Sequence, residues 1–190
     1  MSKEYTGAKD KSIINQLDDE CYLKSCTFDD IPALVQIAQT TYQEHYPYLW
    51  KDKGVYYIAN HYNAAAFEKE LSDKNAISYL IFYKNTICGF LKLNQNAPLN
   101  VYTSEEAIEL ERIYLSKAVV GRGLGQSIMQ SVAQIAQSLN KKVIWLKTMD
   151  SSGADRFYQK CGYEVCGKTV LAVEGIYEHL QGQLIMMKQI

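Results

Sequence analysis

Apolar residues recur every three or four positions in several parts of the chain, which is the spacing that places them on one face of an α-helix. The strongest stripe runs from Leu124 to Leu139. An earlier stripe follows Asp29 and Asp30, residue types that are favoured at an N-cap, with Pro32 in the expected first turn. The pattern predicts helices over residues 31–42, 63–71, 124–139 and about 154–161.

Shorter runs of apolar and β-branched residues, separated by turns, predict strands. These runs cover residues 22–25, 78–83, 86–93, 107–115, 142–148, about 163–169 and 183–188. The turn Lys84-Asn85 joins the second and third runs as a hairpin. The strands on either side of the 124–139 helix should run parallel, through a right-handed crossover. We therefore expect an α/β protein of the α+β kind, built on a mixed sheet.

Simple alternation along the strand over residues 107–115 assigns its side chains to two faces of the sheet. One face is expected to carry Glu109, Glu111, Ile113 and Leu115, and the other Leu110, Arg112 and Tyr114. The two carboxylates should therefore point in the same direction.

Length and composition limit the organisation and the partners of the chain. Its 190 residues are expected to form one domain over residues 21–190, preceded by a polar tail or extension over residues 1–20. The net charge of −1 gives no general attraction to nucleic acid or membrane, and no apolar run suits a membrane span or a signal peptide. Five cysteines without a C-x-x-C pair and three scattered histidines argue against a zinc site and for reduced thiols in the cytoplasm.

Tyrosines gather between Tyr42 and Tyr62, with Trp50 among them. Aromatic residues of this kind are ordinary core and rim material, and we favour that interpretation. The alternative is a pocket for an apolar or cationic ligand.

A glycine-rich segment, residues 119–126, lies directly before the long helix. Backbone N–H groups at a helix start lack intrahelical partners and carry partial positive charge, so such a turn suits a phosphate group. Gln126 stands where a dinucleotide fingerprint needs glycine, and the Gly-Lys-Ser/Thr of a nucleotide P-loop is missing. The segment is therefore either a phosphate cradle of another kind or a simple glycine-rich turn.

Three segments of the chain match one known family in type and in order. They are Glu109-Leu-Glu-Arg-Ile-Tyr-Leu115, Val120-Gly-Arg-Gly-Leu-Gly125 and Arg156-Phe-Tyr-Gln-Lys-Cys-Gly-Tyr163. Together they resemble the GCN5-related N-acetyltransferase (GNAT) superfamily, over about residues 21–190. The resemblance implies the acyl-CoA acyltransferase fold of that family, a mostly antiparallel central sheet with a parallel, splayed strand pair and flanking helices. The phrases Phe67-Glu-Lys-Glu-Leu71 and Glu-Arg-Ile-Tyr are also similar to bacterial spermidine/spermine (polyamine) N-acetyltransferases.

This resemblance implies acetyl-CoA as the co-substrate and no metal. The residues it assigns to the pyrophosphate are Val120, Gly121, Arg122, Gly123, Leu124, Gly125 and Gln126. It assigns the pantetheine arm to the backbone of Ile113, Tyr114 and Leu115, and a further cofactor contact to Ser151. Val120 replaces the family's Gln or Arg, and Ser151 replaces a frequent Asn. We expect Arg122 to substitute in part as a charged donor, with a modestly weaker affinity for CoA.

The same resemblance implies that Tyr158 is the general acid that protonates the leaving thiolate, a role its hydroxyl can fill. The alternative is a tyrosine that only packs on the sheet beside Phe157. Glu109 is our candidate for the general base, with Glu111 as its rival on the same strand. Both carboxylates could instead belong to a solvated face or pair with Arg112.

The favoured function is transfer of an acetyl group to the primary amine of a small molecule, with a polyamine first because carboxylates attract a polyamine cation. Other acceptors in this class are an amino acid, an aminoglycoside or a protein N-terminus. We expect the choice of acceptor to lie in residues 42–62 and 171–181. A second hypothesis is a non-catalytic regulator that binds acyl-CoA, suggested by Val120 and Ser151. A homodimer through the C-terminal strands would cover their exposed edges.

Overall fold

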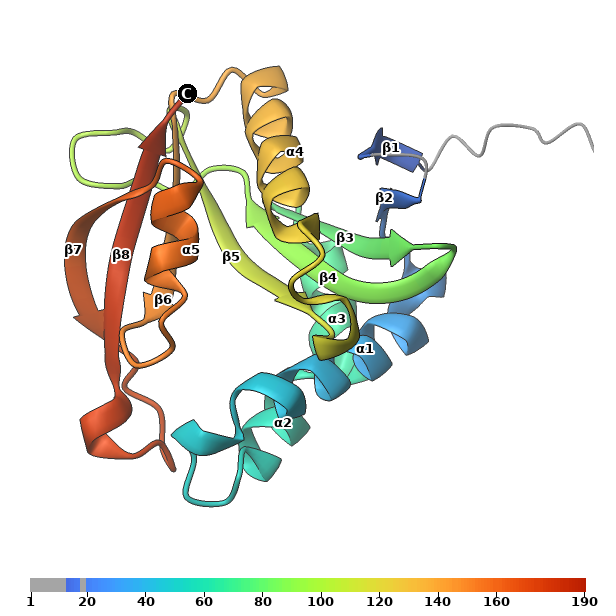
Figure 1. Ribbon diagram of the computed structural model, residues 1–190, viewed down its shortest axis with the longest axis vertical. Helices are drawn as coiled ribbons and strands as arrows, with labels where there is room; N and C mark the ends of the chain where they lie inside the picture. The colour runs from blue at the N-terminus through green and yellow to red at the C-terminus, as the bar shows by residue number, and fades with distance from the viewer. Residues whose placement is uncertain (1–12, 18–19) are drawn as a thin grey trace, which may run out of the picture.

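The computed structural model describes residues 13–17 and 20–190. Within them, one mixed sheet has the strand order β1-β2-β3-β4-β5-β6-β8-β7 (Figure 1). The strands are β1 (Ile13–Gln16), β2 (Cys21–Ser25), β3 (Ala76–Tyr83), β4 (Thr86–Asn94), β5 (Ala107–Leu115), β6 (Val143–Met149), β7 (Glu164–Val170) and β8 (Gly182–Gln189). Neighbouring strands are antiparallel except β5 and β6, which are parallel. The expected mixed-sheet fold is confirmed.

The polar tail expected over residues 1–20 falls largely outside the described residues, which omit 1–12 and 18–19. Its described part includes β1, whose backbone pairs with β2. The division of the chain into a tail and a single domain stays a prediction.

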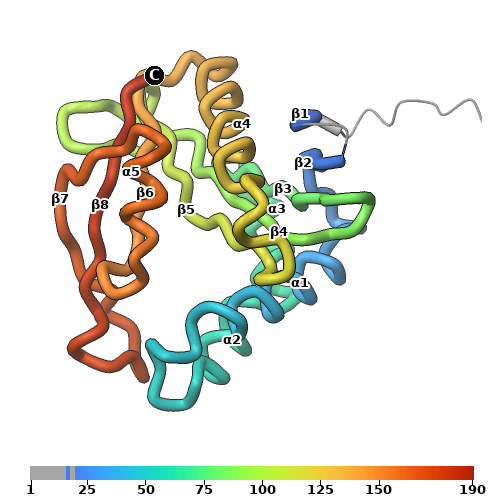
Figure 2. Tube along the Cα trace, in the orientation of Figure 1, coloured from blue at the N-terminus to red at the C-terminus, as the bar shows by residue number. Residues whose placement is uncertain are grey.

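Helices cover both faces of the sheet, as Figures 1 and 2 show. One face packs against α1 (Ile31–His45), α2 (Val55–His61) and α3 (Ala64–Ser72), and the other against α4 (Leu124–Ser138) and α5 (Asp155–Lys160). Each face has its own buried core, with Phe67 and Phe90 on the α1–α3 side and Ile128 and Val132 on the α4–α5 side. None of the helices in the described residues combines the length and apolar composition that a bilayer span requires.

Local signals account for several element ends. The Asn63 side chain accepts a hydrogen bond from the Ala66 N–H (2.9 Å) and caps α3. Lys84 and Asn85 have φ of 49° and 60°, the left-handed conformation that a two-residue hairpin requires. Our sequence analysis did not predict α2, because this seven-residue helix buries only Ile58 and so gives no periodic stripe.

Strands β5 and β6 pair only over their first halves. The parallel register joins Ala107–Leu110 to Val143–Leu146. Beyond it, β5 continues in register with β4 only, and β6 with β8 only. The sheet therefore splays apart between β5 and β6 (Figure 1).

A β-bulge in β5 overturns the face assignment that simple alternation predicts. Lys92 of β4 pairs with Arg112, whereas the next residue, Leu93, pairs with Leu110, so Glu111 is an extra residue in β5. Alternation is inverted beyond this point. Ile113 and Leu115 consequently share the α4–α5 core with Leu110, and Tyr114 packs in the α1–α3 core. The expectation that Glu109 and Glu111 share a face with Ile113 and Leu115 is wrong.

Candidate functional site

A cavity of about 260 Å³ occupies the splay between β5 and β6. Its walls come from four groups of elements: the α1–α2 region, β5, β6 and α5, with one residue each from β8 and the loop that precedes it. The lining residues are Tyr42, Tyr46, Leu49, Tyr57, Glu109, Leu110, Glu111, Arg112, Ile113, Tyr114, Lys147, Thr148, Met149, Tyr158, Leu171 and Gln183. The structure thus brings together Tyr158, Glu109, Ile113 and Tyr114, which the sequence analysis singled out separately.

Tyr158 reaches this cavity from α5. Its ring lies 5.2 Å from that of Phe157 and 6.0 Å from that of Tyr163, measured between centroids. Burial raises the pKa of Tyr158 above its ordinary value of 10, and proximity to Tyr46 adds to the shift. The hydroxyl therefore stays protonated at neutral pH and remains a hydrogen-bond donor in the cavity.

Glu109 and Glu111 are brought together by one amide. Asn94 Nδ2 donates to Glu109 Oε2 and to Glu111 Oε2, each at 2.8 Å. Glu109 also accepts a hydrogen bond from Lys147 Nζ at 3.2 Å, whereas Glu111 pairs with Lys92 Nζ at 2.6 Å. Two carboxylates of β5 thus share one partner on β4.

The environment of Glu111 makes this carboxylate a weak base. Burial alone would raise its pKa, but Arg112 and Lys92, together with Asn94, hold the pKa below its ordinary value of 4.5. This lowered pKa argues against Glu111 as the group that accepts a proton.

Arg112 anchors a second, more buried set of charges beneath the site. Its guanidinium contacts the carboxylate of Glu70, which also accepts from Ser78 Oγ at 2.5 Å. Lys92 Nζ lies 3.7 Å from the same carboxylate and joins it to Glu111. Each negative charge near the cavity is thus already opposed by a cation.

Tyrosines from the α1–α2 region and from β5 form one wall of the cavity. Tyr42 stacks on Tyr57 with ring centroids 5.0 Å apart, and Tyr46 meets the edge of Tyr114 at 5.4 Å. Trp50 also stacks on Tyr57 and donates its Nε1–H to the Tyr42 hydroxyl at 3.0 Å. The tyrosine cluster is therefore partly core and partly lining of the cavity, while its use by an apolar or cationic ligand stays a prediction.

The glycine segment lies where β5 leads into α4. Gly121 and Gly123 have φ of 84° and 82°, and Gly123 immediately precedes the first residue of α4, Leu124. A side chain at Gly125 would approach the Phe157 ring to 3.0 Å, so this glycine allows α4 and α5 to pack closely. Helix α4 thus opens toward the loop with the N–H groups of its first turn, of which that of Gln126 donates to Gly123 O at 3.1 Å.

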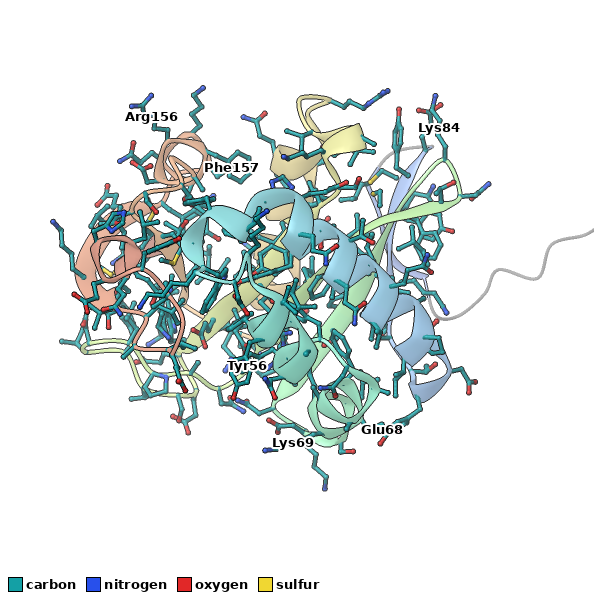
Figure 3. The ribbon with its side chains drawn as sticks, turned by 90° about the horizontal axis from the view of Figure 1, so that it is seen from below. Tyr56, Glu68, Lys69, Lys84, Arg156 and Phe157 are labelled. Carbon is teal, nitrogen blue, oxygen red and sulfur yellow. The ribbon has the colours of Figure 1, made fainter. Side chains whose placement is uncertain are left out.

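Side chains around this loop add polar groups at its edge. Val120 is exposed, and the Arg122 guanidinium lies over the Tyr83 ring, 5.8 Å from its centroid, while its Nε donates to Ala118 O. Lys84 projects from the neighbouring hairpin tip, and Arg156 projects outward from α5 (Figure 3). Ser151 is exposed in the turn after β6 and does not line the cavity.

Sequence reasoning missed Asn94 and Lys147, the two partners of Glu109. Each lies on a different strand, so no local pattern marks them. It also missed a second cavity of about 410 Å³ under α2 and α3, which shares Tyr57, Glu111 and Arg112 with the first. Lys69 of α3 is one of its lining residues, and its side chain points away from the body of the molecule (Figure 3).

The segment between α1 and α2 contacts the loop before β8. Lys51 N–H donates to Gly175 O and Tyr177 N–H to Leu49 O, both at 2.9 Å. An isolated bridge also joins Trp50 and Ile176. The chain between α1 and α2 is thus tied to the loop before β8.

Comparison with known proteins gives the site a context. Residues 32–163 match the acetyltransferase (GNAT) family. An N-acetyltransferase described as uncharacterized, from the pepI 3′ region of Lactobacillus delbrueckii subsp. lactis, is 26% identical over 138 residues, covering 70% of this chain and 78% of the relative.

Two solved structures resemble the fold closely at low sequence identity. PaiA N-acetyltransferase from Thermoplasma acidophilum, in complex with coenzyme A, has a TM-score of 0.68 at 18% identity, over 90% of this chain and 99% of that one. A variant of spermidine N-acetyltransferase SpeG from Vibrio cholerae has a TM-score of 0.64 at 14% identity, over 90% and 95% of the two chains. At these identities the likeness concerns the fold alone.

Proposed function

The chain belongs to the acetyltransferase (GNAT) family of N-acetyltransferases, and on that premise we propose that it transfers the acetyl group of acetyl-CoA to the primary amine of a small molecule. The observation that carries the proposal is the cavity between the splayed β5 and β6, which holds a protonated tyrosine and a carboxylate together. The glycine segment at the start of α4 lies at the end of the same strand β5.

We assign the pyrophosphate and the pantetheine arm of acetyl-CoA to two different segments of the chain. The backbone of residues 120–126 would hold the pyrophosphate, because the left-handed Gly121 and Gly123 and the open helix start favour an anion. The backbone of residues 113–115, which β6 leaves unpaired, would run along the pantetheine arm. Ser151 would contribute from the turn after β6. Val120 offers no polar side chain, so Arg122 is the charged donor we assign to this loop.

The proposed chemistry needs one proton acceptor and one proton donor. Glu109 would take a proton from the ammonium form of the acceptor, directly or through water, and so produce the neutral amine that attacks the thioester carbonyl. Tyr158 would donate to the sulfur as the carbon–sulfur bond breaks and the thiolate departs, and the second proton lost by the attacking nitrogen would return to the Tyr158 oxygen as the amide forms. Their presence in one cavity supports this division of roles.

A polyamine is the acceptor that we place first. The tyrosine wall formed by Tyr42, Tyr46, Tyr57 and Tyr114 suits an ammonium group through cation–π contact, and the second cavity gives room for a long acceptor. The carboxylates give less support than the sequence suggested, because Glu109 and Glu111 already have cationic partners. We therefore expect a preference for a polyamine that depends only weakly on ionic strength.

A panel of amines with acetyl-CoA tests the proposal. Thiol release would be followed with spermidine, spermine, a simple monoamine, an amino acid, an aminoglycoside and a peptide with a free N-terminus. The highest kcat/KM with spermidine or spermine would support a polyamine as the acceptor. The highest value with another amine would make that amine the acceptor and leave the proposed acetyl transfer intact. CoA binding without turnover on any amine would favour the non-catalytic regulator.

We also propose a location and an assembly. The free cysteines and the absence of a membrane-spanning helix among the described residues fit a cytoplasmic enzyme. Strand β7 forms one edge of the sheet and exposes Val165 and Val170. A homodimer through this edge would cover them, and the molar mass from sedimentation tests it.

A further inference from the structure

The last turn of α1 faces two different parts of the site. Tyr42 and Tyr46 line the cavity. Glu44 and His45, which lie between them in sequence, reach the chain that follows β5. His45 Nε2 lies 2.8 Å from Leu115 O, and because a carbonyl only accepts, Nε2 carries the hydrogen.

Glu44 holds the next two residues of the same segment. Its Oε2 accepts the backbone N–H of Lys117 at 2.8 Å, and its Oε1 accepts from Ser116 Oγ at 3.4 Å. Two neighbouring side chains of α1 thus fix three consecutive residues, Leu115 to Lys117. Cys88 O, on β4, accepts the Ser116 N–H at 2.8 Å and holds the segment from the other side.

Residues 115–117, which Glu44 and His45 hold, connect the end of β5 to the glycine loop. Lys117 begins the short 3-10 turn Lys117–Val119, and the loop follows at once. Nothing stands within 4 Å of the Cβ position of Gly121 or Gly123, and Arg122 Nε ties the loop back to Ala118 O, in the 3-10 turn that begins at Lys117. The direction of its N–H groups therefore depends on how its start is anchored.

We propose that Glu44 and His45 are positioning residues for cofactor binding, which hold the entry to the phosphate loop in the orientation that acetyl-CoA requires. The inference rests on the proposed use of this loop by acetyl-CoA. Neither side chain lines the cavity, so both act through the backbone of residues 115–117. The same helix α1 carries Tyr42 and Tyr46, which line the cavity proposed for the acceptor amine. Helix α1 therefore contacts the sites proposed for both substrates.

Steady-state kinetics and CoA binding by calorimetry test the proposal. Glu44→Ala removes a charge-assisted hydrogen bond, and we expect the KM for acetyl-CoA and the Kd for CoA to rise about tenfold. We expect kcat at saturating acetyl-CoA to stay within about threefold, because the reacting groups are untouched. His45→Phe should have a similar effect, and His45→Gln, whose amide can donate in place of Nε2, should restore much of the affinity.

Gln43→Ala is the matched control, since Gln43 is exposed on the same turn and is expected to leave KM, Kd and kcat unchanged. Unchanged KM and Kd in both Glu44→Ala and His45→Phe would overturn the proposal, as would a loss confined to kcat. If Glu44→Ala does not fold, Glu44→Gln takes its place, and His45→Phe tests the other contact. Failure of the wild-type protein to bind CoA would instead contradict the proposed function.

Discussion

Tyr158 is the residue on which the proposed chemistry depends most directly. Tyr158→Phe keeps the ring and its packing against Phe157 and removes only the hydroxyl. We expect kcat to fall about a hundredfold, the lower end of what a general acid contributes, and the Kd for CoA to remain unchanged. Because burial raises the pKa of Tyr158, the wild-type enzyme should keep this donor up to pH 10, with no alkaline loss of kcat from its ionisation.

Tyr163→Phe supplies the control for Tyr158. The Tyr163 hydroxyl is buried and has no hydrogen-bond partner among the described residues. Its removal should leave kcat unchanged and should not lower the free energy of unfolding. Equal kcat values for Tyr158→Phe and the wild-type enzyme would remove Tyr158 from the proposed role.

Glu109 gives a second prediction at this scale. Glu109→Gln keeps an oxygen for Asn94 or Lys147 but removes the proton acceptor. We expect kcat at pH 7 to fall about a hundredfold, with partial recovery at pH 9, where more of the acceptor amine is already neutral. Glu111→Gln should change kcat much less, because Arg112 and Lys92 already keep its pKa low. A larger loss of activity in Glu111→Gln would reverse the assignment.

Among the elements, the glycine loop and helix α4 form one unit. Gly123→Ala introduces a side chain at φ 82°, where space is open but the conformation costs about 1–2 kcal/mol. We expect the free energy of unfolding, measured by urea denaturation, to fall by that amount. We also expect a higher Kd for CoA, because the helix start shifts. Asn140→Ala, at φ 56° beyond the other end of α4, should also destabilise the protein but keep the Kd. An unchanged Kd in Gly123→Ala would show that the glycine loop does not contribute to CoA binding.

How much of each element the sequence could predict depends on the range of the signal. The stripe from Leu124 to Leu139 and the Lys84-Asn85 turn are local patterns, and both elements form as predicted. The faces of β5 were predicted wrongly because the bulge at Glu111 arises from pairing with β4, which the sequence of β5 alone does not encode. The site shares this limit, since Glu109 is visible in sequence but its partners on β4 and β6 are not.

On the scale of the whole molecule, charged groups tie together elements that are distant in sequence. Glu70 of α3, Lys92 of β4 and Arg112 of β5 lie in one network, and Glu111 extends it toward the cavity. This network lies where the sheet begins to splay, so it helps hold the α1–α3 layer on the sheet beside the site. Breaking it should therefore affect the stability of the fold as well as the shape of the cavity.

The pH dependence of stability tests this network. The pKa of Glu111 in the folded protein is lower than its ordinary value of 4.5, so the ionised form favours folding. Its contribution is fully present above about pH 4.5 and is lost as pH falls through the lower folded value. We expect the free energy of unfolding, from urea titrations between pH 6 and pH 3, to decline across the acid end of that range. Glu111→Gln should be less stable at pH 6 and should show a shallower decline, and equal slopes for the two proteins would show that Glu111 does not couple protonation to folding.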